Sequence, residues 1–336
     1  MKSEKALVYL CNNKKFLGLW LSKLFKEKVD ADLYIIVNER NKQLIPYFIK
    51  MIEKSGHPFN NVRIYHDGTL LNDFKGGLKK NIQRMIDTYE LSIKVLLPWY
   101  IIEELEYLQM IFMDDDTCLF KNPFVLMNDK KVFTTFNFLD NIYKVPSKNN
   151  KADILNFIKC FQNKDFGNFE EGLKFIERHR SDAGIWGINR RFYWDIYRGA
   201  VLRFFDSGYF QHLILNTKKR TFNKFINKTD KPKNIDADKF KSSNRIRTFD
   251  QRLFTIAFFL YDHSQVSWIS PNKDIFHLFI HIFPKWLSKR KSAPQGTPYF
   301  IHYGASSWKN EFNEYIGKYY NFTENGERIP NVNYEA

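Results

Sequence analysis

Three consecutive carboxylates, Asp114, Asp115 and Asp116, end an apolar run that begins at Gln109. A run of this length that stops at charge is typical of a buried strand that reaches the edge of an α/β sheet, where ligands of such sheets bind. Adjacent carboxylates repel one another, and a divalent cation compensates them because carboxylate oxygens suit Mg²⁺ and Mn²⁺. The pattern therefore predicts a metal site; the alternative is a solvated acidic turn before the loop at 121–123.

Three other groups of residues suit the same chemistry, although each is weak alone. Lys94 precedes an apolar stretch and, on a helix, would bring a cationic head toward the carboxyl edge of the sheet. Asp250 and Gln251 stand at the head of an apolar helix, where an aspartate is often only an N-terminal cap. His302 follows a short strand, and Lys309 lies seven residues further on. A histidine in such a place is usually structural, but imidazole also binds metals and lysine binds phosphate.

The elements that would position these residues alternate between strand-like and helical patterns. This alternation favours a parallel sheet with right-handed crossovers. An amphipathic stretch from Ser92 to Leu105 reads as a helix that runs directly into the acidic strand. Small residues at the start of the 181–189 run permit close approach of a ligand or another backbone. We expect strands at 6–10, 32–37, 62–65, 109–113, 132–136, 181–189 and 299–303.

Length and composition indicate a globular α/β protein. With 336 residues and 44% hydrophobic content, the chain suffices for one large domain or two modest ones. No apolar run reaches the roughly 18 residues that span a bilayer, and the N-terminus lacks a signal-peptide pattern. The three cysteines, Cys11, Cys118 and Cys160, read as reduced thiols. We therefore expect a cytoplasmic protein, and the sequence leaves its oligomeric state open.

The chain is strongly basic, with a formal net charge of +15. Such a protein is drawn to polyanions such as nucleic acid, an anionic membrane surface or phosphorylated substrates. The basic residues gather at 218–252 and 285–291. Two plainer interpretations are solvated loop surface and a coding bias toward Lys, Asn, Ile, Phe and Tyr.

In their order along the chain, these groups resemble the motifs of the GT-A glycosyltransferases of family 8, the glycogenin and lipopolysaccharide galactosyltransferase group. The run 112–116 resembles that family's aromatic-aliphatic-Asp-x-Asp motif, and 92–98 resembles the preceding helix, in which Arg is usual where this chain has Lys94. Asp182-Ala183-Gly184 resembles the family's Asn-x-Gly strand, and Asp250-Gln251 resembles its Asp-Gln pair. His302 with Lys309 resembles its His-x-x-Gly-x-x-Lys motif. The chain departs from the family where Asp182 replaces Asn, where Asp115 fills a usually neutral position, and in the spacing after His302.

The resemblance implies a GT-A, Rossmann-like single α/β domain with a mixed, mostly parallel central sheet and a helical, basic C-terminal insertion. The expected boundaries are a domain at 1–310 with a nucleotide-binding half at about 1–136 and an acceptor half at about 181–310, insertions at about 137–180 and 215–247, and a tail at 311–336.

The resemblance also implies transfer of a sugar from a UDP-sugar to a hydroxyl acceptor, with retention of anomeric configuration. Asp114, Asp116 and His302 would hold Mn²⁺ or Mg²⁺ against the diphosphate, and Lys309 would contact the same phosphates. The residues implied for the rest of the donor are Asn12, Asn13 and Phe16 at the uridine, and Lys94, Asp115, Asp182 and Gln251 toward the phosphates and sugar. Asp250 and Gln251 are expected at the reactive face as the catalytic contacts.

The acceptor is inferred from charge. The net charge of +15 suits a phosphate backbone, and no membrane segment is expected. An enzyme of this type could therefore glycosylate hydroxymethylated bases in duplex DNA, as phage DNA glycosyltransferases do. The alternatives are a glycan, lipopolysaccharide core or protein acceptor, with peripheral membrane contact through Trp286 and its basic neighbours. A second alternative is a non-enzymatic, basic nucleic-acid-binding protein, which would leave the acids at 114–116 unexplained.

Overall fold

The computed structural model describes residues 3–11, 28–37, 39–46, 48–50, 59–66, 70, 90–114, 117–119, 121–127, 131–136, 181–206, 249–261, 263–269, 275–277, 299–302, 320–322 and 328–330. The predicted insertion at 137–180 and both basic segments, apart from residues 249–252, lie outside these ranges.

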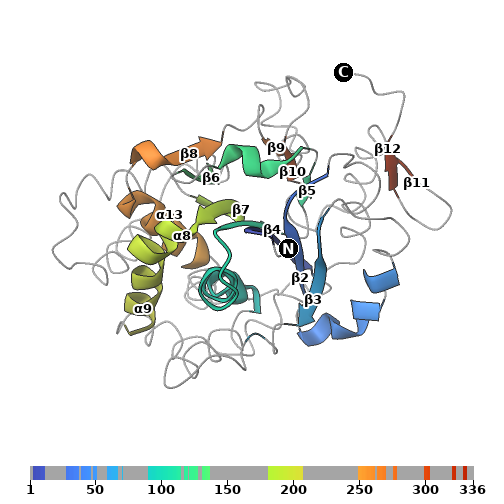
Figure 1. Cartoon of the computed structure of the whole chain (residues 1–336), viewed down its shortest axis with the longest axis horizontal. Coiled ribbons are helices and arrows are strands. Elements are labelled where there is room, and N and C mark those ends of the chain that lie inside the picture. The colour runs from blue at the N-terminus through green and yellow to red at the C-terminus, as the bar shows by residue number, and fades with distance from the viewer. Residues whose placement is uncertain are drawn as a thin grey trace, which may run out of the picture.

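A seven-stranded sheet in the order β3-β2-β1-β4-β7-β6-β8 forms the centre of the molecule (Figure 1). Its strands are β1 (Lys5–Cys11), β2 (Asp32–Val37), β3 (Val62–His66), β4 (Gln109–Asp114), β6 (Val132–Phe136), β7 (Ser181–Asn189) and β8 (Val266–Ile269). The β1–β2, β2–β3, β1–β4 and β6–β8 pairs are parallel, whereas β7 runs antiparallel to both of its neighbours. The sheet confirms the predicted mixed, mostly parallel α/β class, with a Rossmann-like order 3-2-1-4 in its first half.

The helical segments cover the sheet, and α13 packs against β7, α9 and η2. They are η1 (Glu39–Leu44), η2 (Glu90–Val95), η3 (Trp99–Glu104), η4 (Pro123–Leu126), α8 (Arg190–Phe192), η5 (Tyr193–Tyr197), α9 (Arg198–Asp206), α13 (Phe249–Leu260) and η6 (His263–Gln265). Within the described residues, no helix combines the length and the apolar character needed to cross a membrane.

The central strands are buried on both faces, because alternate side chains enter two separate cores. Val8, Phe112 and Trp186 belong to the first core, which the residues of η2, η3, α9 and α13 complete. Tyr9 and Met113 belong to the second, together with residues of η4 and of a second, smaller sheet. Burial on both faces is why these strands read as continuous apolar runs in the sequence.

The smaller sheet has the order β5-β10-β9, with β5 (Thr117–Leu119), β9 (Ile275–His277) and β10 (Phe300–His302) close together in Figure 1. β5 follows β4 after two residues, so the small sheet begins where the central strand ends. A separate hairpin is formed by β11 (Tyr320–Phe322) and β12 (Arg328–Pro330).

The stretch predicted as one helix from Ser92 to Leu105 is two short helical segments. A 3₁₀ helix, η2, ends at Val95, and a π-helix, η3, begins at Trp99 after its N-cap residue Pro98. Proline has no backbone N–H and disfavours the α conformation in the residue before it, which accounts for a break at this point.

Candidate active site

The acidic strand, β4, ends at the topological switch point of the sheet. From β1 the chain adds β2 and β3 on one side, and β4 then pairs with the other side of β1. Ligands of open α/β sheets bind outside the carboxyl ends of the strands at such a switch point. In the β1–β4 pair Asp114 is the register partner of Leu10, two residues before Asn12. The register therefore places the C-terminal ends of β1 and β4 at the same edge of the sheet.

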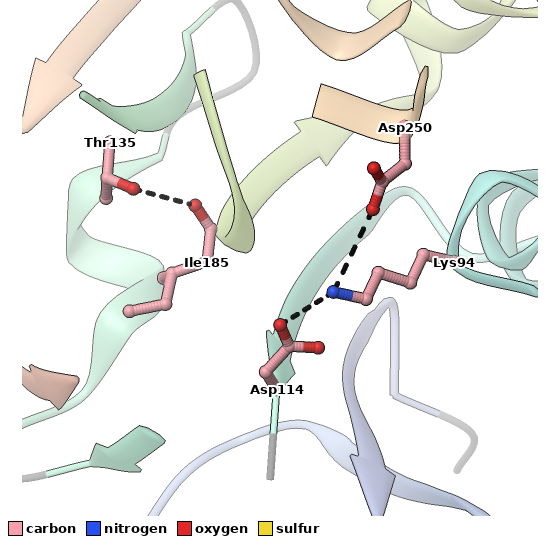
Figure 2. Close-up of polar contacts among 5 residues, drawn as sticks. All are labelled: Lys94, Asp114, Thr135, Ile185 and Asp250. Atoms are coloured by element: carbon pink, nitrogen blue, oxygen red, sulfur yellow. Dashed lines mark hydrogen bonds and ion pairs between the residues drawn. The ribbon is translucent and has the colours of Figure 1, made fainter. Parts of the chain in front are cut away.

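Lys94 joins the acidic strand to the head of α13. Its ammonium lies 2.6 Å from the Oδ2 atom of Asp114 and 4.0 Å from the Oδ2 atom of Asp250, as Figure 2 shows. The lysine is only 5% exposed and Asp250 only 2%. Burying a charge is costly unless it is paired, so the three groups stabilise one another in place. The predicted position of the Lys94 head at the carboxyl edge is confirmed.

The ring of Phe112 also contacts the Lys94 ammonium. Its centroid lies 5.6 Å from the Lys94 ammonium, within range of a cation–π attraction. The ring also stacks on Trp186, with centroids 5.0 Å apart, and Trp186 lies 4.4 Å from Phe254 of α13. This aromatic column sets the separation between β4 and α13, and therefore between Asp114 and Asp250.

A tyrosine that sequence reasoning missed holds the segment that carries Lys94. The Tyr197 hydroxyl donates a hydrogen bond of 2.9 Å to the carbonyl oxygen of Val95, the residue after Lys94. Burial, followed by the nearby Tyr193 and Asp250, raises the pKa of Tyr197 well above its ordinary value, so this donor keeps its proton. The aromatic run in which Tyr197 lies has no feature that marks one ring for this contact.

Two residues of the predicted Asp182-Ala183-Gly184 segment, Ala183 and Gly184, lie in a bulge beside the acidic strand. Thr134 pairs with Trp186, but the next residue of β6, Thr135, pairs with Asp182, so three residues of β7 bulge out between these partners. The Thr135 hydroxyl donates across the bulge to the carbonyl oxygen of Ile185, at 3.5 Å (Figure 2). Ile185 in turn pairs with Met113, so the bulge adjoins the end of β4. Bulges of this kind are frequent next to active sites.

The small sheet brings His302 to the residues that follow the acids. In the antiparallel β5–β10 pair, Thr117 is the register partner of His302. Three residue steps separate Asp114 from Thr117, a chain span of at most about 11 Å. The backbone therefore places His302 beside Thr117, three residues after the end of β4, although its position in the sequence is remote.

Among the described residues, no group of three or more His, Cys, Asp or Glu side chains is arranged to hold a metal ion. The predicted donor set, carboxylates after β4 and an imidazole from β10, mixes oxygen and nitrogen, which Mn²⁺ accepts, and it stays a prediction. The buried hydroxyl of Thr117 has no hydrogen-bond partner in the described part of the chain. This atom does not single out an ion site, because the Oε1 atom of Gln109 and the Nε1 atom of Trp186 are also buried without a hydrogen-bond partner among the described residues.

The structure thus brings together Lys94, Asp114 and Asp250 with their side chains. It places Asp182, Gln251 and His302 by their backbones alone, in β7, α13 and β10. The other predicted site residues lie outside the described ranges: Asn12, Asn13, Phe16, Asp115, Asp116 and Lys309.

No protein-family model matches the chain, and no curated protein matches it. Among solved structures, mouse xyloside xylosyltransferase 1 in its apo form is 12% identical, with 91% of this chain and 98% of that one covered and a TM-score of 0.44. The apo structure of the bifunctional glycosyltransferase WbbM is 11% identical over 94% of this chain and 50% of that one, with a TM-score of 0.43. An active-site mutant of LgtC is 10% identical over 95% of this chain and 98% of that one, with a TM-score of 0.41. These TM-scores are too low to carry a conclusion about the activity of this chain.

Proposed function

We propose that the protein is a metal-dependent, retaining glycosyltransferase that moves a sugar from a UDP-sugar to a hydroxyl acceptor. The observation that carries the proposal is the buried contact of Lys94 with Asp114 and Asp250 at the carboxyl edge of the sheet. These residues come from three motifs that are far apart in the sequence and that resemble one family's donor site. The division into a domain at 1–310 and a tail at 311–336 is part of the same proposal.

The resemblance gives each residue a role that its chemistry allows. Asp114, Asp116 and His302 would hold Mn²⁺ or Mg²⁺, which would neutralise charge on the departing diphosphate as a Lewis acid. Lys94 orients the Asp114 carboxylate and faces the donor sugar. Asp250 and Gln251 line the reactive face, where the acceptor hydroxyl attacks.

The other donor contacts belong to the same proposal. Lys309 adds a cationic contact to the phosphates, which stabilises the leaving group. Asn12, Asn13 and Phe16 receive the uridine, and Asp115 and Asp182 complete the donor pocket. No separate general base is required if the leaving phosphate accepts the proton of the attacking hydroxyl.

We propose a hydroxymethylated base in duplex DNA as the acceptor. What supports this is the net charge of +15 and its concentration at 218–252 and 285–291. A glycan, a lipopolysaccharide core or a protein hydroxyl is the alternative, which the same assay separates.

The donor reaction is tested by incubating the full chain with Mn²⁺ and a panel of UDP-sugars and measuring UDP release with and without chelator. We expect release with one UDP-sugar, and a loss of about 100-fold or more in Asp116→Ala, because a catalytic metal contributes several kcal/mol. The matched control is Asp195→Ala, which removes an exposed acid that pairs with Arg191 on the helix surface and should leave release unchanged. If no UDP-sugar gives metal-dependent release, the proposed activity is wrong.

The acceptor is tested by adding duplex DNA with or without 5-hydroxymethylcytosine and weighing the nucleosides by mass spectrometry. A hexose or pentose mass on the hydroxymethylated base alone would support DNA as the acceptor. UDP release without a DNA adduct would reject DNA and favour a glycan or protein acceptor. DNA binding that Asp116→Ala leaves unchanged, with no release in the wild type, would favour a non-enzymatic nucleic-acid-binding protein.

A further inference from the structure

The helical run from Arg190 to Asp206 turns a basic face with an exposed tryptophan toward solvent. The run consists of α8, η5 and α9, which follow one another without a break. Its exposed or partly exposed side chains include Trp194 and the arginines Arg190, Arg191, Arg198 and Arg203. The proposed donor site gives none of these residues a role.

Trp194 is exposed and yet held in place. Within the run 190–206 it is the one large apolar side chain that is exposed, at 45%. The guanidinium of Arg198 lies 5.4 Å from the centroid of its ring, and the Tyr193 ring lies 5.3 Å away at a steep angle. Glu103 of η3 accepts hydrogen bonds from both Arg198 and the Tyr193 hydroxyl. An aromatic surface that is already ordered loses little conformational freedom when it binds a partner.

The arginines of this face exceed the carboxylates that neutralise them. Arg198 pairs with Glu103, at 3.0 Å. Arg191 pairs with Asp195, but both side chains are more than half exposed, and an exposed pair of this kind adds little stability. In the described part of the chain, no ion pair involves Arg190 or Arg203. The face is therefore complementary to an anionic partner.

The length of the face and its single exposed ring fit a nucleic-acid strand better than a membrane. Arg190 and Arg203 lie about 20 Å apart along the run at a rise of about 1.5 Å per residue, and successive phosphates of a strand are spaced at about 3.4 Å in a duplex. Guanidinium groups bind phosphates, and an aromatic ring accepts a stacked base. A helix that lies on a membrane buries a whole apolar face, whereas this face offers Trp194 alone.

We propose that this face binds a strand of DNA, with phosphates at Arg190, Arg191 and Arg203 and an unstacked base on the Trp194 ring. The inference rests on the proposed function, for whose DNA acceptor it names a contact surface outside the donor site. The same run adjoins that site, because the Tyr197 hydroxyl donates to the carbonyl oxygen of Val95, the residue after Lys94. An enzyme that acts on a base must take it out of the stack, and a ring that holds an unstacked base favours that state.

The phosphate contacts are tested by the salt dependence of binding. Anisotropy of a short, labelled oligothymidine measures its affinity for the full chain over a range of salt concentrations. We expect Arg190→Gln with Arg203→Gln to reduce the slope of log affinity against log salt by about 1.4, since each phosphate contact on a single strand contributes about 0.7. The matched control, Lys28→Gln with Lys50→Gln, removes two exposed lysines and lowers the net charge equally, from +15 to +13, and should keep the slope.

The stacking contact is tested at Trp194. We expect Trp194→Ala to weaken oligothymidine binding about 5- to 100-fold, the usual contribution of one stacked base, and Trp194→Phe to lose less because it retains a ring. The inference is overturned if the wild type does not bind oligothymidine at low salt, if the arginine variant has the slope of its lysine control, or if Trp194→Ala binds as the wild type does. Binding of anionic lipid vesicles in place of DNA by these residues would also overturn it.

Sugar transfer measured on the same samples separates this inference from the proposed function. The expected binding pattern without transfer from any UDP-sugar would reject only the glycosyltransferase. Transfer to DNA with binding that the variants leave unchanged would reject only the role of this face.

Discussion

The buried ammonium of Lys94 is the single group on which the described part of the site depends. Asp250 is almost wholly buried and Asp114 largely so, and both lie within 4.0 Å of this ammonium. A buried ion pair adds little net stability compared with an apolar substitute, but removal of one partner leaves the other charge uncompensated. The consequences of losing the lysine are therefore larger than those of losing an ordinary surface lysine.

We expect Lys94→Met to lower the free energy of unfolding by about 3 kcal/mol, because two carboxylates lose their cation in a buried place. Urea unfolding measures the loss. The double variant Lys94→Met with Asp250→Asn should recover part of it, since one of the two buried carboxylates is then neutral. Lys50→Met, at an exposed position, is the control and should change stability by less than about 0.5 kcal/mol. A Lys94→Met protein as stable as this control would contradict the expectation.

At the scale of single residues, sequence reasoning found the groups whose type carries charge. Lys94, Asp114 and Asp250 were identified because carboxylates and ammoniums next to apolar runs have few uses other than binding or capping. Tyr197 was missed because it acts through the backbone carbonyl of Val95, which no side-chain pattern reveals.

At the scale of elements, the close packing of β7 against its neighbours is decided by a glycine. A Cβ atom at Gly187 would lie 2.3 Å from a ring carbon of Phe133 and 2.7 Å from the sulfur of Met127. Both neighbours are buried, and Gly187 pairs with Phe133 across β6 and with Ile111 across β4. A side chain here would therefore have to displace the Phe133 ring and the Met127 side chain, which pack over β7.

We expect Gly187→Ala to destabilise the protein by about 1–3 kcal/mol, the usual cost of overpacking a core. Gly199 in α9 provides the opposite case, because a Cβ atom there meets nothing within 4 Å. Gly199→Ala should stabilise by about 0.5–1 kcal/mol through the helix preference of alanine. Thermal and urea unfolding of the two variants give the comparison, and equal effects of the same sign would refute this account of Gly187.

The positions of the strands were predicted better than their directions or the breaks in the helices between them. The runs at 32–37, 132–136 and 181–189 coincide with β2, β6 and β7, because burial on both faces leaves a continuous apolar signal. The same signal does not depend on direction, so the antiparallel course of β7 was not readable. The break in the expected 92–105 helix could have been predicted from Pro98, which lacks a backbone N–H. The prediction of one helix followed the apolar periodicity instead.

At the scale of the whole molecule, the sheet class was predicted because strand-helix alternation has few stable solutions. For the site, the sequence showed the order of the motifs along the chain but not the distances between them. Those distances depend on β4, η2 and α13 meeting at one edge of the sheet. They also depend on the stacked rings from Phe112 to Phe254, which set the spacing between these elements. The charge of +15 has no such structural consequence, since net charge governs association and not fold.

The first core has a second property of the whole molecule, a set of tyrosines that ionise with difficulty. Burial raises the pKa of Tyr34, Tyr107, Tyr193 and Tyr197. Hydrogen bonds add to this effect for two of them, because Tyr107 donates to Asp32 and Tyr193 donates to Glu103. In the unfolded chain each tyrosine titrates near its ordinary pKa of about 10.

We therefore expect the free energy of unfolding to fall as the pH rises above about 10. In that range the unfolded chain has lost protons that the folded chain retains, so alkali favours unfolding, by up to about 1.4 kcal/mol per pH unit for each such tyrosine. The contribution is fully present below pH 10 and disappears as the pH passes the raised folded-state values. Urea unfolding between pH 8 and 11 measures the slope, and Tyr197→Phe should make it shallower because one of the linked protons is gone. A slope that this variant leaves unchanged would mean that Tyr197 titrates in the folded protein as it does in the unfolded chain.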